Sequence, residues 1–237
     1  MKKLLTITAL TVLLLAAAAP GRAQTRRKRK APPPPPPTIA VIAPVKQVPV
    51  DQGRFEGGVY SNDFFGLSFA TPEGWFTQDA EAKKRIMDTG MEVVGEGATA
   101  RKKAAMEAAM KRTHFLVSVS KYDPSAPGPD FNALLMCVAE RVPSAVITTE
   151  AEYIRMSIRS LQGTSAQATM TGPVRTVKLG GTNFATADVK MTIGPMVAVQ
   201  KYYVRLMKGH ALAFVYTYVD DSDLKPLEDL LATVKFK

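Results

Sequence analysis

Cysteine and histidine are almost absent from this chain of 237 residues, which contains one cysteine, Cys137, and two histidines, His114 and His210. A single cysteine excludes an intramolecular disulfide. We expect Cys137 to be a small buried side chain within a helix, with a reactive thiol or an intermolecular bridge as the alternatives. Neither histidine has a second histidine or a cysteine at the spacing of zinc ligands, so the sequence predicts no metal site.

The common catalytic and cofactor motifs are also missing. The chain contains neither the G-x-S-x-G motif of serine hydrolases nor the H-E-x-x-H motif of zinc proteases. Gly95 to Ala100 matches G-x-G-x-x-A, but the preceding segment is too short and too helical for the buried strand of a dinucleotide site. We therefore expect no catalytic residue and no cofactor, which favours a non-enzymatic protein.

Acidic residues are absent from the first 50 positions. This segment contains nine of the 31 basic residues, which leaves 22 basic and all 21 acidic residues in the remainder, a net charge of +1. The N-terminal segment thus carries +9 of the net charge of +10, which does not indicate a nucleic-acid-binding domain.

Long hydrophobic runs are lacking as well. The longest, Leu4 to Ala19, has 16 residues, follows Lys2 and Lys3, and ends at Pro20. It is shorter than the roughly 20 residues that span a bilayer, and small residues precede Gln24. We expect residues 1–23 to be a signal peptide cleaved after Ala23, with a retained anchor as the alternative, and the protein to be exported to the periplasm or beyond the cell.

A basic and proline-rich segment follows at residues 24–50. Six consecutive prolines, Pro32 to Pro37, favour an extended polyproline II rod, and we expect a disordered linker. Its five adjacent cations are the candidate contacts to an anionic membrane surface or another polyanion: Arg26, Arg27, Lys28, Arg29 and Lys30. The alternative is a solvated linker that its charge keeps extended.

Residues 51–237 are expected to form a single globular domain with a helical insertion at about 78–112. Alternation at Phe65, Leu67 and Phe69 predicts a first core strand, closed by the turn Thr71 to Gly74. Later strands are expected at 114–121, 174–179, 183–193, 197–207, 211–219 and 233–236. Helices are expected at 78–94, 99–112, 130–142, 149–163 and 224–231.

The fold class that this order predicts is α+β, an antiparallel sheet flanked by helices. The short turns Gly180-Gly181, Gly194-Pro195 and Lys208-Gly209 between the four strands expected from 174 to 219 make neighbouring strands antiparallel. Ala187, Val189 and Met191 should share one face of the sheet, and Phe214 and Tyr216 should share a face as well.

Several short motifs resemble the bacterial exported relatives of the PsbP-like α/β/α sandwich, whose namesake is an extrinsic photosystem subunit. They include Gly180-Gly181 with Phe184, the run Gln200 to Tyr203, and seven structural residues near the start of the domain: Tyr60, Asn62, Phe65, Gly66, Pro72, Gly74 and Trp75. The resemblance implies an antiparallel sheet between helical layers and a superfamily of accessory or binding subunits. It carries over no catalytic residue.

Two functional hypotheses remain. The preferred one is an exported, non-enzymatic accessory or interaction protein that its basic segment tethers to the cell envelope or to a protein partner there. The alternative is a small-ligand binder or enzyme that uses a cleft beside the helical insertion.

Overall fold

The described part of the chain contains most of the expected globular region. The computed structural model describes residues 49–78, 85, 88, 92, 95, 98–124, 126, 129, 131–142, 147–162 and 164–237. The expected signal peptide, the cations of the linker and most of the expected helix at 78–94 lie outside these residues. The division of the chain at residues 23 and 50 stays a prediction.

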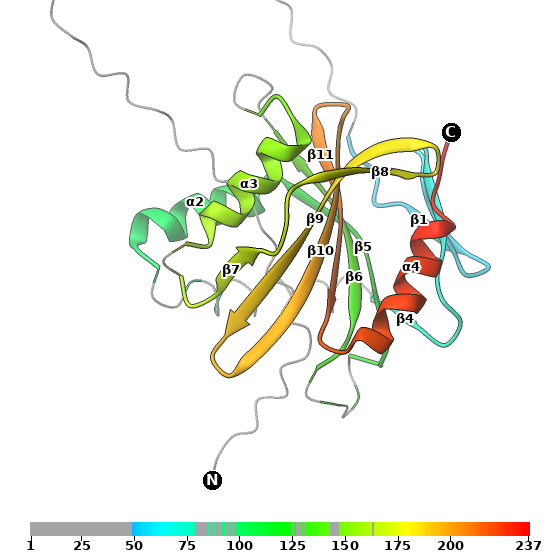
Figure 1. Cartoon of the computed structure of the whole chain (residues 1–237). Coiled ribbons are helices and arrows are strands. Elements are labelled where there is room, and N and C mark those ends of the chain that lie inside the picture. The colour runs from blue at the N-terminus through cyan, green and yellow to red at the C-terminus, as the bar shows by residue number, and fades with distance from the viewer. Residues whose placement is uncertain are drawn as a thin grey trace, which may run out of the picture.

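The described strands form two antiparallel sheets (Figure 1). The larger sheet has the order β4-β5-β6-β11-β10-β9-β7, and β8 also pairs with β9. Its strands are β4 Phe76–Thr77, β5 Thr113–Ser120, β6 Leu134–Arg141, β7 Gln167–Met170, β8 Arg175–Leu179, β9 Thr182–Ile193, β10 Met196–Met207 and β11 His210–Tyr218. The smaller sheet has the order β1-β2-β3-β12, with β1 Arg54–Glu56, β2 Val59–Asn62, β3 Leu67–Ala70 and β12 Lys235–Phe236.

The described helices are α2 Ala100–Met110, α3 Glu150–Ser160 and α4 Leu224–Ala232, the last preceded by the short 3-10 helix η1 Asp221–Asp223. Helix α3 contacts β7, β9 and β10, whereas α4 contacts β3 of the smaller sheet. Figure 1 shows α2 and α3 together on one side of the large sheet and α4 with the smaller sheet on the other. The expected α+β architecture is confirmed.

The four consecutive strands β8 to β11 lie where the sequence predicts them, with ends that agree to within one residue. Short turns connect them as antiparallel neighbours. At the turn between β10 and β11, Lys208 has φ 50° and Gly209 has φ 74°. Two positive φ values are typical of a type I′ turn, whose twist matches that of the strands on either side.

The expected helix at 130–142 is wrong, because Leu134–Arg141 is strand β6, between β5 and β11. Its residues from Leu134 to Glu140 are all buried, since both faces of this central strand are covered. A strand that is buried on both faces shows no polar alternation, and its apolar run cannot be distinguished from a buried helix by periodicity. Cys137 therefore lies in a strand, and it is fully buried.

Two hydrophobic clusters occupy the two faces of the large sheet. Leu134, Met136 and Val138 of β6 belong to the cluster under α3, and Leu135, Cys137 and Ala139 to the cluster under α4 and the smaller sheet. The expected face-sharing is confirmed: Ala187, Val189 and Met191 face the first cluster, and Phe214 and Tyr216 the second.

The motif residues near the start of the domain build the smaller sheet. Asn62 is buried, its Nδ2 donates to the Asp51 carbonyl at 2.9 Å, and its Oδ1 accepts from the Phe65 amide at 2.9 Å. Tyr60 is buried as well, and its hydroxyl donates to the Gln52 carbonyl at 3.0 Å. These bonds fix the entry of the chain against β2.

The loop positions of the same motif set the turns. Gly66 and Gly74 have φ 65° and 76°, and a Cβ on Gly66 would lie 3.1 Å from the Lys237 carbonyl. Trp75 is half-buried against the cluster under α4.

Candidate functional site

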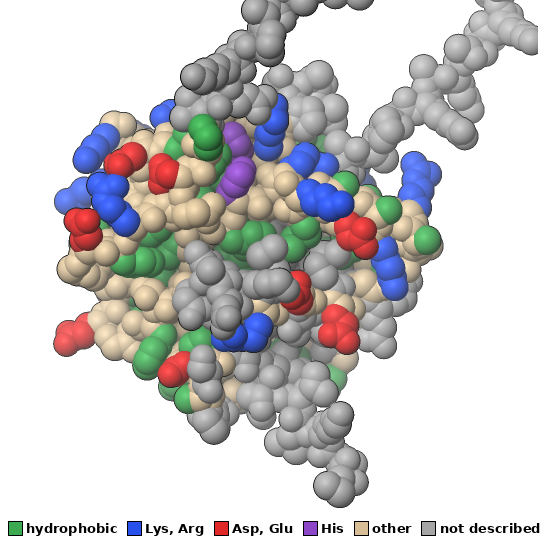
Figure 2. Space-filling view, turned by 180° about the vertical axis from the view of Figure 1, so that it is seen from behind, with side chains coloured by type: hydrophobic (Ala, Val, Ile, Leu, Met, Phe, Trp, Pro, Cys, Tyr) green, Lys and Arg blue, Asp and Glu red, His purple; other side chains and the backbone are tan. Residues whose placement is uncertain are grey.

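The two histidines, far apart in sequence, are neighbours in space. Their ring centroids lie 6.0 Å apart, and Figure 2 shows the two side chains together on one face of the molecule. His210 Nδ1 donates to the Lys208 carbonyl at 2.8 Å, and its ring packs edge-on against Phe64 and Phe65. Partial burial lowers the pKa of His210, and His114 and Arg141 act in the same direction.

The histidine pair is a poor candidate metal site. Within the described ranges, no group of three or more His, Cys, Asp or Glu side chains could hold a metal ion. The lowered pKa of His210 reflects apolar and cationic surroundings, which also disfavour a bound cation.

A buried carboxylate lies at the end of β6 that is nearest to α2 and α3. Glu140 is 1% exposed, accepts from Arg112 Nη2 at 3.2 Å through Oε1, and accepts from the Tyr153 hydroxyl at 2.9 Å through Oε2. Burial, and then the adjacent carboxylate, raises the pKa of Tyr153. This network joins the end of α2, β6 and α3, and a paired carboxylate without solvent access is suited to structure rather than to proton transfer.

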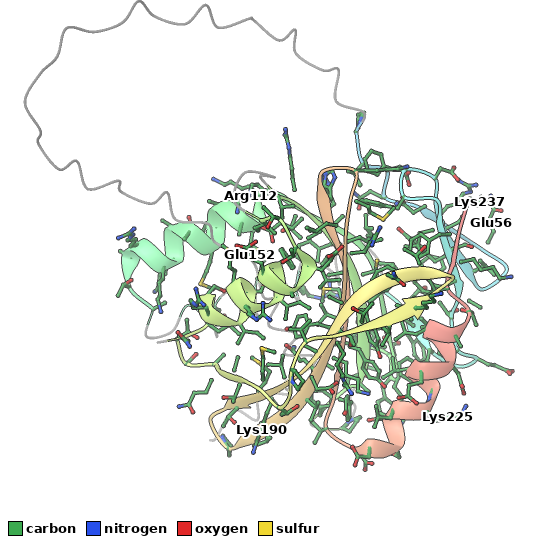
Figure 3. The ribbon with its side chains drawn as sticks, turned by 45° about the horizontal axis from the view of Figure 1, so that its top comes forward. Glu56, Arg112, Glu152, Lys190, Lys225 and Lys237 are labelled. Carbon is green, nitrogen blue, oxygen red and sulfur yellow. The ribbon has the colours of Figure 1, made fainter. Side chains whose placement is uncertain are left out.

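Helices α2 and α3 lie side by side (Figure 3). Residues of both helices line a groove of about 430 Å³. Thr99 begins α2, because its Oγ1 accepts from the Lys102 amide at 3.4 Å. Met106 and Ala109 are the buried residues of this alanine-rich helix. The groove therefore lies beside the part of the expected helical insertion that the structure describes.

Helix α3 is fixed at its beginning by a threonine cap. Thr149 Oγ1 accepts from the Glu152 amide at 3.2 Å. The Glu152 carboxylate accepts from the Thr148 amide and hydroxyl, and these bonds lower the pKa of Glu152. Tyr153, Ile154 and Ile158 face the sheet, so the opposite part of α3 is left to line the groove.

The groove has an apolar floor and a cationic rim. Ala105 and Met106 of α2 and Met156 of α3 form its apolar lining. The polar lining consists of Thr99, Arg101, Lys102, Arg159 and Ser160. The lining contains no carboxylate, and no ion pair between described residues involves its three cations. Such a site can bind a negative charge and an apolar group side by side.

A second cavity of about 390 Å³ lies between the turn after β3 and α4. Pro72 and Trp75 line one side, Pro226 and Asp229 the other. The Asp229 carboxylate pairs with Lys225 one turn earlier on α4, and Thr233 Oγ1 accepts from the Ala70 amide at 2.9 Å. Thr233 thus holds the end of α4 on the smaller sheet, whereas the ion pair of Asp229 lies within α4.

The residues that the sequence predicts as polyanion contacts differ from those that line the groove. Arg26, Arg27, Lys28, Arg29 and Lys30 lie outside the described residues. Of the groove residues, Ala105 and Met106 follow from the helical stripe of the sequence, whereas nothing in the sequence distinguishes Arg101, Lys102 and Arg159 from other surface cations. Charged residues on surface helices are common, and only the pairing of α2 with α3 distinguishes these three.

No protein-family model and no curated protein matches the chain. Two solved structures are similar to it in fold. Cyanobacterial PsbP from Synechocystis sp. PCC 6803 is 16% identical over 76% of this chain and 91% of that one, with a TM-score of 0.45. LpqN of Mycobacterium tuberculosis, which is involved in cell envelope biogenesis, is 10% identical over 72% and 83%, with a TM-score of 0.41.

The first of these structures carries the name of the PsbP-like proteins that the sequence motifs resemble, and the likeness concerns the fold alone. Among the described residues, no helix has both the length and the apolar character needed to cross a bilayer.

Proposed function

We propose that this chain is an exported, non-enzymatic accessory protein that binds a small ligand in the groove between α2 and α3. The observation that carries the proposal is the groove itself. It is concave, about 430 Å³ in volume, and lined by apolar and cationic side chains. This volume lies within the range of about 300–1,000 Å³ typical of small-molecule sites.

Binding without catalysis fits the chemistry of the lining. Its residues include no histidine, cysteine, aspartate or glutamate that could act as a nucleophile or as a general base. Cys137 and Glu140 are buried within the sheet, and neither lines the groove. The hydroxyl groups of Thr99 and Ser160 have no histidine or carboxylate in the lining to activate them, so the groove is suited to holding and orienting a ligand.

Native mass spectrometry of the chain purified from its own host tests this function. We expect a small molecule to accompany the wild-type chain and to be lost when Met156→Glu places a carboxylate in the groove. The matched control is Arg155→Glu, which introduces the same side chain at the adjacent, exposed position of α3. Equal occupancy in both variants, or no small molecule on the wild-type chain, would contradict the proposal.

Export and tethering are the second part of the proposal. The short apolar run before Ala23 supports export, and the five cations at 26–30, in a segment without acidic residues, support attachment to an anionic surface of the cell envelope. A protein partner in the envelope is the alternative anchor.

Flotation with anionic liposomes at low salt tests the tether. Deletion of residues 24–37 should abolish binding and leave the melting temperature unchanged. A second variant keeps the length of the segment and replaces its five cations by glutamine. It should also lose binding, because the cations and not the length of the segment are expected to make the contact. Binding that survives both changes would exclude this segment as the tether.

A further inference from the structure

The charge and shape of the groove indicate the class of ligand. We infer that the groove between α2 and α3 binds a single-chain lipid with an anionic head group. This inference rests on the proposed function, because it concerns the same groove.

The positive charge of the groove favours an anionic head group. Arg101 and Lys102 lie in the first turn of α2, and Arg159 lies in the last turn of α3, so cations from both helices lie on the same groove. Arg101 and Arg159 are exposed and form no ion pair with a described residue. An unpaired cluster of cations with hydrogen-bond donors attracts a carboxylate or phosphate and disfavours a cationic head group.

The apolar lining of the groove favours an apolar tail. Ala105, Met106 and Met156 present methyl and thioether groups next to the cations. Methionine side chains are flexible and adapt to a chain that has no fixed shape of its own. An acyl chain gains stability by covering this surface, and its head group remains within reach of the rim.

The groove is short. Along α2 the lining extends from Thr99 to Met106, about 10 Å at the helical rise. A single acyl chain can lie along this length with its head group at the cations.

Calorimetric titration with dodecanoate, below its micelle concentration, tests the inference. The comparison ligands are dodecyl maltoside, which has the same tail and a neutral head, and acetate, which has the head and no tail. The test variant is Arg101→Gln with Arg159→Gln. The matched control is Lys103→Gln with Arg155→Gln, which removes the same charge from exposed positions of the same helices. Both variants retain the N-terminal cations, so non-specific binding of dodecanoate to that segment is the same in the two titrations.

We expect dodecanoate to bind the wild-type chain and to lose about tenfold in affinity when the two groove arginines are removed. The control should change affinity by less than about twofold, because screened charges outside a site contribute little. Dodecyl maltoside should bind about tenfold more weakly than dodecanoate, and acetate should show no saturable binding.

Other outcomes separate the two proposals. Equal affinities for dodecanoate and the maltoside, both lost in Met156→Glu, would overturn the anionic head group and support a small-ligand site. Failure of both ligands to bind would overturn the lipid inference, and a co-purified small molecule lost in Met156→Glu would then still support the proposed function. Equal loss in the test and control variants would show that the groove cations have no special role, which also overturns the inference.

Discussion

Glu140 shows how a single buried charge can join three elements. Arg112 and Tyr153 both donate to it, one to each carboxylate oxygen. A carboxylate accepts from both partners at once, whereas an amide of the same shape has only one accepting oxygen. Glu140 therefore holds the end of α2 and the start of α3 against β6, although it does not line the groove.

Replacing Glu140 by glutamine should lower the free energy of unfolding by about 1–3 kcal/mol, because either Arg112 or Tyr153 then faces a donor. Urea unfolding measures this loss. Glu107→Gln, an exposed substitution on α2, is the control and should change stability by less than about 0.5 kcal/mol. A loss for Glu140→Gln no larger than that of the control would contradict a structural role for the network.

His210 gives the fold a dependence on pH. Burial lowers its pKa in the folded state below the unfolded value of about 6.5, so the unfolded chain binds the proton first as pH falls. The stability that its neutral form contributes is present above about pH 6.5 and is lost as pH falls through the lowered folded value.

The wild-type free energy of unfolding should therefore fall more between about pH 7.5 and pH 5.5 than that of His210→Gln. Urea titrations at the two values measure the difference, and the carboxylates common to both proteins cancel. An equal fall in wild type and variant would mean that His210 does not contribute.

At the scale of elements, the turns are the features that the sequence predicts best, and strand β6 is the element that it predicts worst. Gly180-Gly181 and Lys208-Gly209 mark hairpins by residue type alone, and the strands they join were predicted to within one residue. The sequence predicts a helix where strand β6 lies, because neighbours cover both faces of β6, which is a property of the assembled sheet. The amphipathic helix α3 was predicted because a capping threonine precedes its one-sided apolar stripe.

The β8–β9 turn also shows how tightly the C-terminus is packed. A Cβ on Gly180 would lie 2.7 Å from the Val234 carbonyl, whereas a Cβ on Gly181 would meet nothing within 4 Å. Both glycines have positive φ, 54° and 79°, so alanine is strained at either position.

Thermal or urea unfolding of the two alanine variants separates the cost of the positive φ from the cost of the steric clash with Val234. Gly181→Ala should cost about 1 kcal/mol, the cost of left-handed backbone in alanine, and Gly180→Ala at least about 1 kcal/mol more. Equal losses would show that the chain near Val234 moves away without cost.

At the scale of the whole molecule, the groove lies on one side of the large sheet, and the smaller sheet with α4 lies on the other (Figure 1). The sequence predicted the class of this arrangement and placed a cleft beside the helical insertion as one hypothesis. It could not predict which cations gather there, because Arg101 and Arg159 belong to helices about 50 residues apart in the chain, brought together only by packing on the same side.

The most direct test of the account is an NMR titration of the chain, with 13C-labelled methionine methyl groups, by dodecanoate. Met106 and Met156 line the groove, and Met207 packs against the cluster on the opposite face of the sheet and serves as the internal control. The account predicts saturable shifts of the Met106 and Met156 resonances with that of Met207 unchanged. Saturable shifts confined to Met207, or no shift at either groove methionine, would contradict it.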